Sequence, residues 1–388
     1  MTRNPRARQA RGASHAGEKH AVIVGPVAHG GHCVARIPVG PDSDETRVVF
    51  VRHALPGEEV IVEITEGTDG DRFWRGDAVR INMPSPDRVE APCPYAGPGA
   101  CGGCDFQHVA VPAQRELKAA VIREQFSRLA RMEVDVTVEP VPGDVNGLAW
   151  RTRMEYAKTP AGWRGMRRHR SRSVIPIDEC LIAAPNAIDT ATAGDRPVLE
   201  EVHGRGFSVA ADGFWQVHPG APETLVDTVI GMLDPQPGER ALDLYSGAGL
   251  FTRFLAERVG ESGRVVAIEG SREATGHARS NLADQRQVRL RAGSVDRVLA
   301  HDFDESFDLV VLDPPREGAR RKVVTQVVDR APRAVAYVAC DPAALARDVA
   351  TFAEFGYVMR ELRAFDLFPM THHVECVALL TKSGSDLR

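Results

Sequence analysis

The carboxyl-terminal part of the chain alternates short apolar runs with amphipathic segments. Seven strand-length runs follow residue 238, namely ALDLYS, RVVAIEG, QVRLRAG, FDLVVLD, AVAYVAC, YVMRELRAF and HVECVALLTK. Helical segments separate the earlier runs, and apolar strands alternating with helices are typical of a parallel sheet that is covered on both faces. The pattern predicts a doubly wound, Rossmann-like α/β domain over residues 221–388.

The amino-terminal part has a different pattern. Residues 1–20 are basic and show no hydrophobic periodicity, so we predict a disordered tail. Over 21–82, runs such as AVIVGP and VVFV are strand-like, and Val60, Val62 and Ile64 alternate with polar neighbours. This pattern predicts a small OB-like β-barrel. Residues 21–80 hold six Arg and ten Asp or Glu, a net charge of −4, so the barrel is not a simple electrostatic clamp for nucleic acid.

Residues 83–220 are predicted to form a small central α+β domain. A loop rich in Pro, Gly and Cys (84–110) precedes an amphipathic helix at about 112–130, and short strands follow. The segment 151–173 carries eight basic residues, one acid and Trp163. Basic residues around an aromatic side chain favour a nucleic-acid surface, and a solvated charged hairpin is an equally good interpretation of these residues alone.

Composition narrows the class of protein. The chain has 388 residues, 43% apolar and 26% charged, with a net charge of −5, which is typical of a globular protein without a general basic field. No apolar run approaches the length of a membrane span, and the amino terminus lacks the apolar core of a secretory signal. Seven cysteines without an export signal favour a reducing cytoplasm, where grouped cysteines indicate metal or catalytic sites. We expect a cytoplasmic monomer.

The run LDLYSGAGLF predicts a strand, a glycine turn and a helix. Gly247 and Gly249 let a ligand approach the backbone at the helix amino terminus, although a tight turn alone would explain them. Glu269 ends the next strand, 20 residues after Gly249, near the spacing at which an acid binds ribose hydroxyls. The third glycine of the dinucleotide motif is missing, which favours a nucleoside without pyrophosphate. S-adenosylmethionine fits this description better than NAD.

Three further residues follow or begin strands of the predicted sheet. Asp313 precedes two prolines in FDLVVLDPPREG, and Cys340 ends AVAYVAC, so both belong to the edge at which open α/β sheets bind ligands. Glu375 lies in an apolar run, where burial raises the pKa of a carboxyl group. An antiparallel last strand would bring Glu375 to the same edge. Each residue has an alternative interpretation. The prolines after Asp313 are explained by a stiff turn, Cys340 by a buried apolar side chain, and Glu375 by a structural carboxylate with a paired partner.

A set of cysteines has spacing that suits metal ligation. Cys93, Cys101 and Cys104 lie close together in sequence, and Cys180 follows Cys104 after 75 intervening residues. Four thiolates bind zinc or an iron–sulfur cluster, and the spacing alone does not choose between them. A redox pair of Cys101 and Cys104 is a further alternative, although no thioredoxin-like pattern surrounds it.

These motifs together resemble the S-adenosylmethionine-dependent RNA uracil-5-methyltransferases. The resemblance covers about residues 20–382 and is most specific in LDLYSGAG, LDPPREG, YVACDP and FDLFPMTHHVECVALL. The resemblance is greatest to the branch that carries an iron–sulfur cluster and an N-terminal TRAM domain, which is an RNA-binding barrel. Enzymes that modify 23S rRNA typify this branch. The Asn that commonly follows the nucleophile in this family is Asp341 here.

The resemblance implies a role for each matching residue. Cys340 matches the nucleophile that adds to carbon 6 of uracil, and Glu375 matches the base that removes the proton from carbon 5. The residues matching S-adenosylmethionine contacts are Gln216, Tyr245, Gly247, Gly249, Glu269 and Asp313. The residues matching ligands of a [4Fe-4S] cluster are Cys93, Cys101, Cys104 and Cys180.

The expected activity is methyl transfer to carbon 5 of a uridine in RNA. Ribosomal RNA is favoured, and transfer RNA is an alternative substrate. An exocyclic-amine methyltransferase would also carry an Asp-Pro-Pro loop, but it would not need Cys340. A non-catalytic RNA-binding protein with a degenerate cofactor fold would not bind S-adenosylmethionine at all.

Overall fold

The computed structural model describes residues 12–39, 45–194 and 196–384, which form two compact units. The first unit contains the described residues of Met1–Leu117 together with Lys158–Asp178 and Met370–His372. The second contains Lys118–Ala157, Glu179–Pro369 and the described residues of His373–Arg388. No helix in these described ranges is long and apolar enough to cross a membrane.

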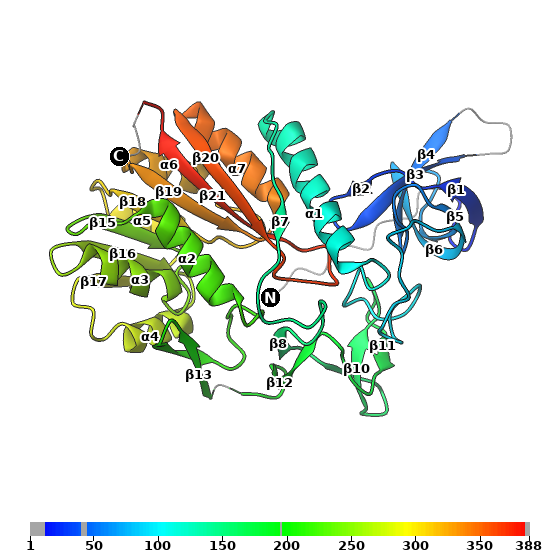
Figure 1. The fold of residues 1–388 in the computed structure, drawn as a ribbon, viewed down its shortest axis with the longest axis horizontal. Coiled ribbons are helices and arrows are strands. Elements are labelled where there is room, and N and C mark those ends of the chain that lie inside the picture. The colour runs from blue at the N-terminus through cyan, green and yellow to red at the C-terminus, as the bar shows by residue number, and fades with distance from the viewer. Residues whose placement is uncertain (1–11, 40–44, 195, 385–388) are drawn as a thin grey trace. The chain divides into compact units, whose positions relative to one another are not determined.

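The second unit is built on an eight-stranded sheet (Figure 1). In spatial order its strands are β17 (Val288–Ala292), β16 (Arg264–Glu269), β15 (Arg240–Leu244), β18 (Leu309–Leu312), β19 (Ala334–Ala339), β21 (Glu375–Lys382), β20 (Tyr357–Phe365) and β7 (Val138–Glu139). Strands β15 to β19 are parallel, and β21 is antiparallel to both of its neighbours. The chain order reverses between β15 and β18, which is where doubly wound sheets bind ligands. The predicted Rossmann-like fold is confirmed.

Helices cover both faces of this sheet because strand residues alternate between two apolar cores. Leu242 of β15 packs into a core with α5 (Val295–Asp302), α6 (Arg320–Asp329) and α7 (Pro342–Glu354). Ala241, on the opposite face, packs with α2 (Ala221–Leu233) and α3 (Leu250–Val259). The helix that connects β16 to β17 is α4 (Arg272–Asn281).

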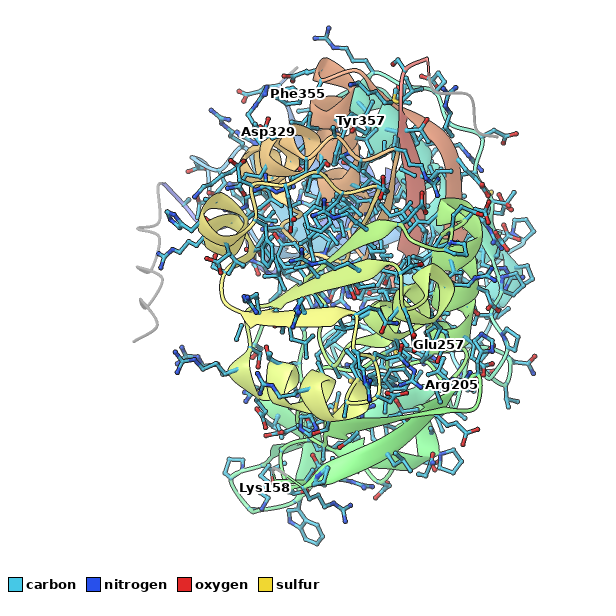
Figure 2. All side chains as sticks on the ribbon, turned by 90° about the vertical axis from the view of Figure 1, so that its left-hand side faces the viewer. Lys158, Arg205, Glu257, Asp329, Phe355 and Tyr357 are labelled. Carbon is cyan, nitrogen blue, oxygen red and sulfur yellow. The ribbon has the colours of Figure 1, made fainter. Side chains whose placement is uncertain are left out.

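Short strands precede the sheet in the second unit. The hairpin of β13 (Pro197–Val202) and β14 (Arg205–Ala210) is tied to α3 by an ion pair of 2.8 Å between Arg205 Nε and Glu257 Oε1 (Figure 2). β8 (Arg151–Met154) pairs in parallel with β12 (Ala183–Asp189). The predicted helix after the cysteine loop is α1 (Val111–Gln125), which continues as one π-helical turn at Phe126–Ala130.

The first unit contains a six-stranded, mostly antiparallel sheet that curves around one apolar core. Its strands in spatial order are β1 (Lys19–Ile23), β5 (Glu59–Glu66), β6 (Phe73–Met83), β4 (Thr46–Arg52), β3 (His32–Pro38) and β2 (Val27–Ala28). The segment that follows β1 is hydrogen-bonded to β3. Gly25 N donates a hydrogen bond to Val34 O (2.7 Å), and Val34 N donates one to Pro26 O (3.0 Å). The inward residues Val60, Val62 and Ile64 are at most 1% exposed, as their alternation predicts.

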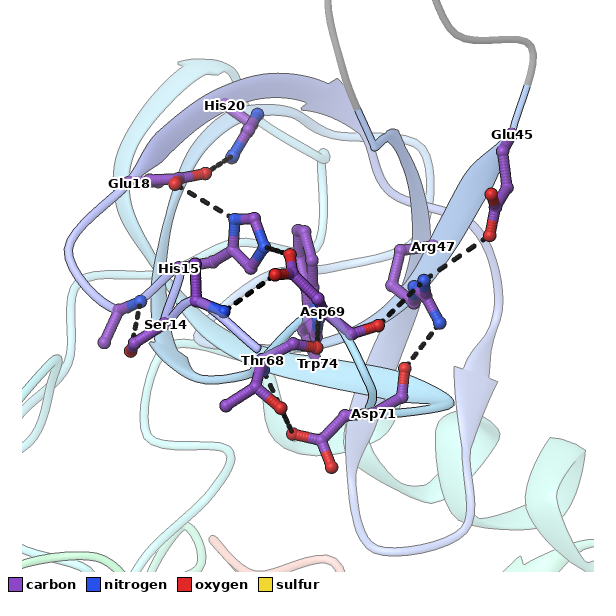
Figure 3. A network of polar contacts seen from close by, with 12 residues as sticks. Ser14, His15, Glu18, His20, Glu45, Arg47, Thr68, Asp69, Asp71 and Trp74 are labelled. Atoms are coloured by element: carbon purple, nitrogen blue, oxygen red, sulfur yellow. Dashed lines mark hydrogen bonds and ion pairs between the residues drawn. The ribbon is translucent and has the colours of Figure 1, made fainter. Parts of the chain in front are cut away.

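The amino-terminal segment of this barrel begins earlier than the sequence suggests. The His15 ring stacks on Trp74 with 4.1 Å between centroids, and its Nε2 lies 2.7 Å from Asp69 Oδ1 (Figure 3). Ala13 N also donates to Asp69 Oδ2 at 2.7 Å. The predicted tail boundary at residue 20 therefore lies too late, because a lone His and Asp give no periodic signal. The tail prediction for residues 1–11 lies outside the described residues.

Candidate active site

The glycine turn after β15 has the backbone conformation that the motif predicts. Gly247 and Gly249 adopt φ values of 54° and 92°, in the left-handed region that favours glycine. A Cβ atom on Gly249 would lie 2.9 Å from Leu282 Cδ1. Tyr245 also has a positive φ of 66°, and such strain in a non-glycine residue tends to occur at functional sites. This turn leads directly into α3, and the first N–H groups of a helix have no acceptor within the helix, so such a terminus suits a polar ligand.

Glu269 is linked directly to this turn. Its Oε2 accepts a hydrogen bond from Gly247 N (2.9 Å), and its Oε1 accepts one from Ser271 N (2.6 Å). Each carboxylate oxygen has two lone pairs, so both can still accept hydrogen bonds from ribose hydroxyls. The structure thus brings three of the predicted cofactor residues, Gly247, Gly249 and Glu269, into one local arrangement.

Asp243 is a functional candidate that our sequence analysis missed. It is fully buried in β15, where Oδ2 accepts a hydrogen bond from Thr252 Oγ1 (2.5 Å) and Oδ1 has no partner among the described residues. Burial raises the pKa of Asp243 to about 7, and that of Asp313 to about 7 with added repulsion from Asp243 and Glu269. The signal was present as a lone acid in the apolar run ALDLYS.

These carboxyl groups suit a cationic nucleoside. S-adenosylmethionine carries a positive sulfonium centre, and a positive charge beside buried carboxyl groups stabilises their ionised form. The unpartnered Oδ1 of Asp243 and the positive φ of Tyr245 are both features that a bound ligand would explain. The residues present therefore fit this methyl donor.

The three predicted reactive residues meet at one edge of the sheet. Asp313 directly follows β18, Cys340 directly follows β19, and Glu375 begins β21. β21 runs antiparallel to β19, with Ala339 opposite Cys376, so Glu375 lies beside Cys340 on the neighbouring strand. The antiparallel direction of β21 is the condition under which Glu375 comes to this edge.

The electrostatics of these residues reflect their closeness. Burial, together with the neighbouring carboxyl groups of Glu375 and Asp313, raises the pKa of the Cys340 thiol to about 12. Glu375 is 4% exposed, and burial together with Asp313 raises its pKa well above the usual range. The Arg316 guanidinium acts in the opposite direction by lowering the thiol pKa. The ionisation of the Cys340 thiol is thus coupled to that of the carboxyl groups beside it, as is common at functional sites.

A buried network fixes the loop that carries Asp313 and Arg316. Tyr337 Oη donates to Asp348 Oδ2 (2.6 Å), and the same oxygen accepts from Ala319 N (2.8 Å) at the start of α6. Gly318 has a φ of 79°, and a Cβ atom there would lie 2.6 Å from Asp348 Oδ2. The Asp-Pro-Pro loop is therefore attached at its carboxyl end to α7 and β19, which also flank Cys340.

Asp341 has a structural function that explains why an acid can stand beside the thiol. Its side chain caps α7 by accepting a hydrogen bond from Ala344 N at 2.8 Å. Asn caps helices about as well as Asp, so the position needs an oxygen acceptor rather than a charge. The Asp341 carboxylate contributes to the raised pKa of the Cys340 thiol.

We therefore expect Asp341→Asn to lower the pKa of the Cys340 thiol while keeping the helix cap. The thiolate fraction at a given pH rises, so alkylation of Cys340 at pH 8 becomes about twofold faster. Peptide-resolved mass spectrometry after iodoacetamide treatment measures this rate separately for each cysteine. A Glu354→Gln variant, which changes an exposed carboxyl group at the far end of the same helix, provides the comparison. Slower alkylation in Asp341→Asn would contradict the electrostatic role.

Gln216 lies apart from the strand edge in sequence, on the loop between β14 and α2. Its side chain is 9% exposed, and the next residue, Val217, accepts hydrogen bonds through its carbonyl from Thr152 N (2.8 Å) and Oγ1 (3.0 Å). These bonds hold the Gln216 loop against β8. Its contact with the cofactor stays a prediction.

The segment before Glu375 is held by a buried ion pair. Lys118 Nζ lies 2.5 Å from Asp366 Oδ1, with both side chains at most 2% exposed, and also donates to Phe368 O at 3.0 Å. Asp366 directly follows Phe365, which is opposite Glu375 in the β20–β21 register. Breaking a buried pair leaves an uncompensated charge, so this pair fixes the start of β21.

The four cysteines of the predicted metal site are divided between the two units. Cys93, Cys101 and Cys104 lie in one loop of the first unit, and Cys180 lies in the second unit. Gly103 N donates to Cys101 Sγ and Gln107 Nε2 donates to Cys104 Sγ, each at 3.4 Å, as suits sulfur that carries negative charge. Across residues 12–39, 45–194 and 196–384, no three His, Cys, Asp or Glu side chains are grouped as metal ligands. The four-cysteine site stays a prediction.

The basic segment is an exposed hairpin for most of its length. In the first unit, β10 (Arg164–Arg167) pairs with β11 (Val174–Pro176), and Trp163 is 70% exposed beside them. The exposed cations of this hairpin are Lys158, Arg164, Arg167, Arg168, Arg170 and Arg172. Arg153 of the second unit differs from them because it is 5% exposed and donates to Glu200 Oε1 at 2.9 Å.

Comparison with known proteins agrees with this arrangement. Residues 201–383 match the tRNA (Uracil-5-)-methyltransferase family model, and residues 14–79 match the TRAM domain. An uncharacterized RNA methyltransferase of Streptomyces avermitilis is 47% identical over 96% of this chain and 100% of its own length. The 23S rRNA (uracil(1939)-C(5))-methyltransferase RlmD of Vibrio parahaemolyticus is 30% identical over 86% of this chain and 91% of its own.

A solved structure shares the fold. The tRNA (uracil-54, C5)-methyltransferase of Pyrococcus abyssi, in complex with S-adenosyl-L-homocysteine, superposes with a TM-score of 0.68 at 21% identity, over 93% of this chain and 100% of that one. The family match rests on the relatives of higher identity, which extend over nearly the whole chain. The chain therefore belongs to the S-adenosylmethionine-dependent RNA uracil-5-methyltransferases, with a TRAM domain at its amino-terminal end.

Proposed function

We propose that this enzyme methylates carbon 5 of a uridine in 23S rRNA through a covalent adduct between Cys340 and carbon 6. The placement of Cys340, Asp313 and Glu375 at one strand edge supports this most directly. The relatives named RlmD, at 28% and 30% identity, support ribosomal RNA as the substrate. An exocyclic-amine methyltransferase is disfavoured, since such a reaction has no need for a thiol beside a buried acid.

The chemistry explains why these residue types are needed. Carbon 5 of uracil is a weak nucleophile, and addition of the Cys340 thiolate at carbon 6 moves electron density onto it. S-adenosylmethionine supplies the methyl group that carbon 5 then accepts. Glu375 removes the carbon-5 proton, and breaking of the bond between carbon 6 and sulfur restores the ring double bond and the thiolate.

Each protein group has a defined part in this sequence. The high thiol pKa of Cys340 keeps the resting thiol protonated at neutral pH, so its proton passes to a neighbouring carboxylate as sulfur adds to carbon 6, and Asp313, with a pKa of about 7, is placed to accept it. The raised pKa of Glu375 makes its carboxylate a stronger base for the final proton transfer. Asp243, Glu269 and Asp313 supply the negative charge that suits the methyl donor.

We also propose that single-stranded RNA is the form recognised. A stacked uracil must be turned out to reach Cys340, which costs a few kcal/mol and costs least in loops. The barrel and the exposed hairpin with Trp163 would hold the flanking strand, the cations by phosphate contacts and the indole by base stacking.

The substrate is tested by mapping 5-methyluridine in a strain that lacks this protein. We expect one 5-methyluridine to disappear from 23S rRNA and to return when the wild-type chain is supplied. Transfer RNA is the second candidate because the Pyrococcus abyssi enzyme with this fold is named for it. Loss of 5-methyluridine from transfer RNA with unchanged ribosomal RNA would overturn the ribosomal assignment.

We propose further that Cys93, Cys101, Cys104 and Cys180 hold a [4Fe-4S] cluster. The N–H donors to Cys101 and Cys104 sulfur support thiolate ligands, and a loop this poor in apolar residues needs a cross-link. Anaerobically purified protein should be brown and contain about four irons per chain. Cys104→Ser should lose most of the iron, whereas Cys33→Ser, in the barrel core, should retain it. Stoichiometric zinc without visible absorbance would contradict the assignment.

A further inference from the structure

The second unit carries a surface of arginines that the reaction described above does not use. β17 is the terminal strand of the eight-stranded sheet, and together with α4 it faces the viewer in Figure 2. Residues 272–297, which span α4, β17 and the start of α5, contain six arginines and three acids, a net charge of +3. All six arginines are exposed, and we call them the arginine edge: Arg272, Arg279, Arg286, Arg289, Arg291 and Arg297.

Most of these guanidinium groups have no carboxylate partner. Arg291 lies 3.9 Å from Asp302, and the other five make no side-chain hydrogen bond or ion pair with any residue that the structure describes. Asp284 and Asp296 are already paired, each at 2.6 Å, with cations that lie outside the arginine edge. Like charges on one surface repel each other, so an anionic partner would stabilise this surface.

Helical geometry places two of the arginines on one side of α4. Asn281 holds α4 to the β13–β14 hairpin, since its Nδ2 donates to Ser208 O at 3.0 Å. Arg272 and Arg279 are seven residues apart, so they share one side of the helix, and this side is nearly opposite Asn281. Glu273, the remaining acid of the stretch, lies about 100° round the helix from Arg272. The two arginines therefore project away from the hairpin, and α4 also contacts β17.

Two more arginines project from β17 itself. Arg289 and Arg291 are two residues apart, so their side chains lie on the same face of the sheet. In the register with β16 they are opposite Val266 and Ile268, which pack into the core with α5. α4 belongs to the other face, where Asn281 donates to the backbone just before α3. The arginine edge thus flanks the outer side of β17 from both faces of the sheet.

Phosphate groups are the ligands that this surface fits. Over 272–297 the structure shows no exposed large hydrophobic side chain, so neither stacked bases nor the apolar centre of a protein interface would have a surface to pack on. Arginine binds phosphate well because its planar fork donates two parallel hydrogen bonds. Four strand spacings separate β17 from β19, so the edge lies about 19 Å from Cys340. RNA that flanks a bound uridine can cover this distance.

We propose that the arginine edge binds the phosphate backbone of the substrate RNA away from the target uridine. The proposal rests on the proposed function in that RNA is the substrate. It gives the catalytic unit an RNA contact of its own, in addition to the barrel and the exposed hairpin of the first unit. Contacts of this kind fix the position of the RNA and add affinity without reading its sequence.

The salt dependence of RNA binding tests the proposal without measuring methylation. Each phosphate contact releases counterions, so it steepens the decrease in affinity with rising salt. The probe is a fluorescein-labelled 40-nucleotide RNA, a hairpin with single-stranded flanks, bound to full-length protein in 50–200 mM KCl. In the double variant Arg279→Gln/Arg289→Gln we expect the slope of log affinity against log salt to become shallower by about 1.5, and affinity at 100 mM to fall about 30-fold. Arg279→Lys/Arg289→Lys should keep most of the slope.

Controls assign the effect to this surface. Arg258→Gln removes an exposed cation of α3 outside the arginine edge and should leave the slope unchanged. The double variant should bind S-adenosylhomocysteine normally in calorimetry and should raise KM for RNA while keeping kcat. An unaltered slope in the double variant, or an equal loss in Arg258→Gln, would overturn the proposal. A protein that shows the expected slopes but methylates no RNA would instead refute the proposed function alone.

Discussion

Replacement of Cys340 by Ala should abolish methyl transfer while leaving the fold and the methyl donor site intact. The side chain is only partly buried at the end of β19, so its removal leaves no large cavity. Without the thiolate, carbon 5 has no source of electron density, and the rate should fall by at least about 10⁴-fold. Transfer of labelled methyl groups from S-adenosylmethionine to RNA measures this rate.

A matched control separates chemistry from general damage. Cys33→Ala removes a buried thiol from the barrel core, where Cys33 is 2% exposed and bonds to Ala54 O at 3.3 Å. This variant should keep most of its activity per folded molecule. Binding of S-adenosylhomocysteine, measured by calorimetry, should be unchanged in Cys340→Ala. Appreciable methylation by that variant would mean that the reaction proceeds without a covalent step.

Replacement of Glu375 by Gln should stop the reaction one step later. The thiolate can still add and carbon 5 can still accept the methyl group, but no base removes the carbon-5 proton. Turnover should fall by about 10²–10⁴-fold, and a methylated protein–RNA adduct should accumulate. Denaturing gels and intact-mass spectrometry detect this adduct, whose mass includes protein, RNA and one methyl group.

The pH dependence gives a second check on Glu375. Burial raises its pKa, so the fraction of ionised base in the wild type decreases as the pH falls through that raised value. The Gln variant has no such group and should lose this limb of the profile. Glu361→Gln, on the exposed side of β20, should behave as the wild type. Normal release of product by Glu375→Gln would assign the proton transfer to another group.

Much of the reactive edge could be predicted from the sequence because strand ends determine it. Asp313 and Cys340 follow long apolar runs, and parallel strands bring such ends together whatever the details of packing. Glu375 was predictable because a carboxyl group within an apolar run needs a function or a partner. All seven predicted strands of the sheet are present.

Other features depend on contacts between distant segments, which a local pattern does not contain. β7 has only two residues and exists because it pairs with Ala364 and Phe365 of β20. His15 joins the barrel through Asp69 and Trp74, more than 50 positions away. Arg153 was grouped with the basic hairpin, but it is buried against Glu200.

The covalent bond itself can be measured directly. RNA containing 5-fluorouridine at the target position has no proton for Glu375 to remove, so the adduct should be trapped after methyl transfer in the wild type. Digestion and tandem mass spectrometry should then place the modified nucleotide on the peptide that contains Cys340. An adduct on any other residue, or complete turnover without an adduct, would contradict the central claim.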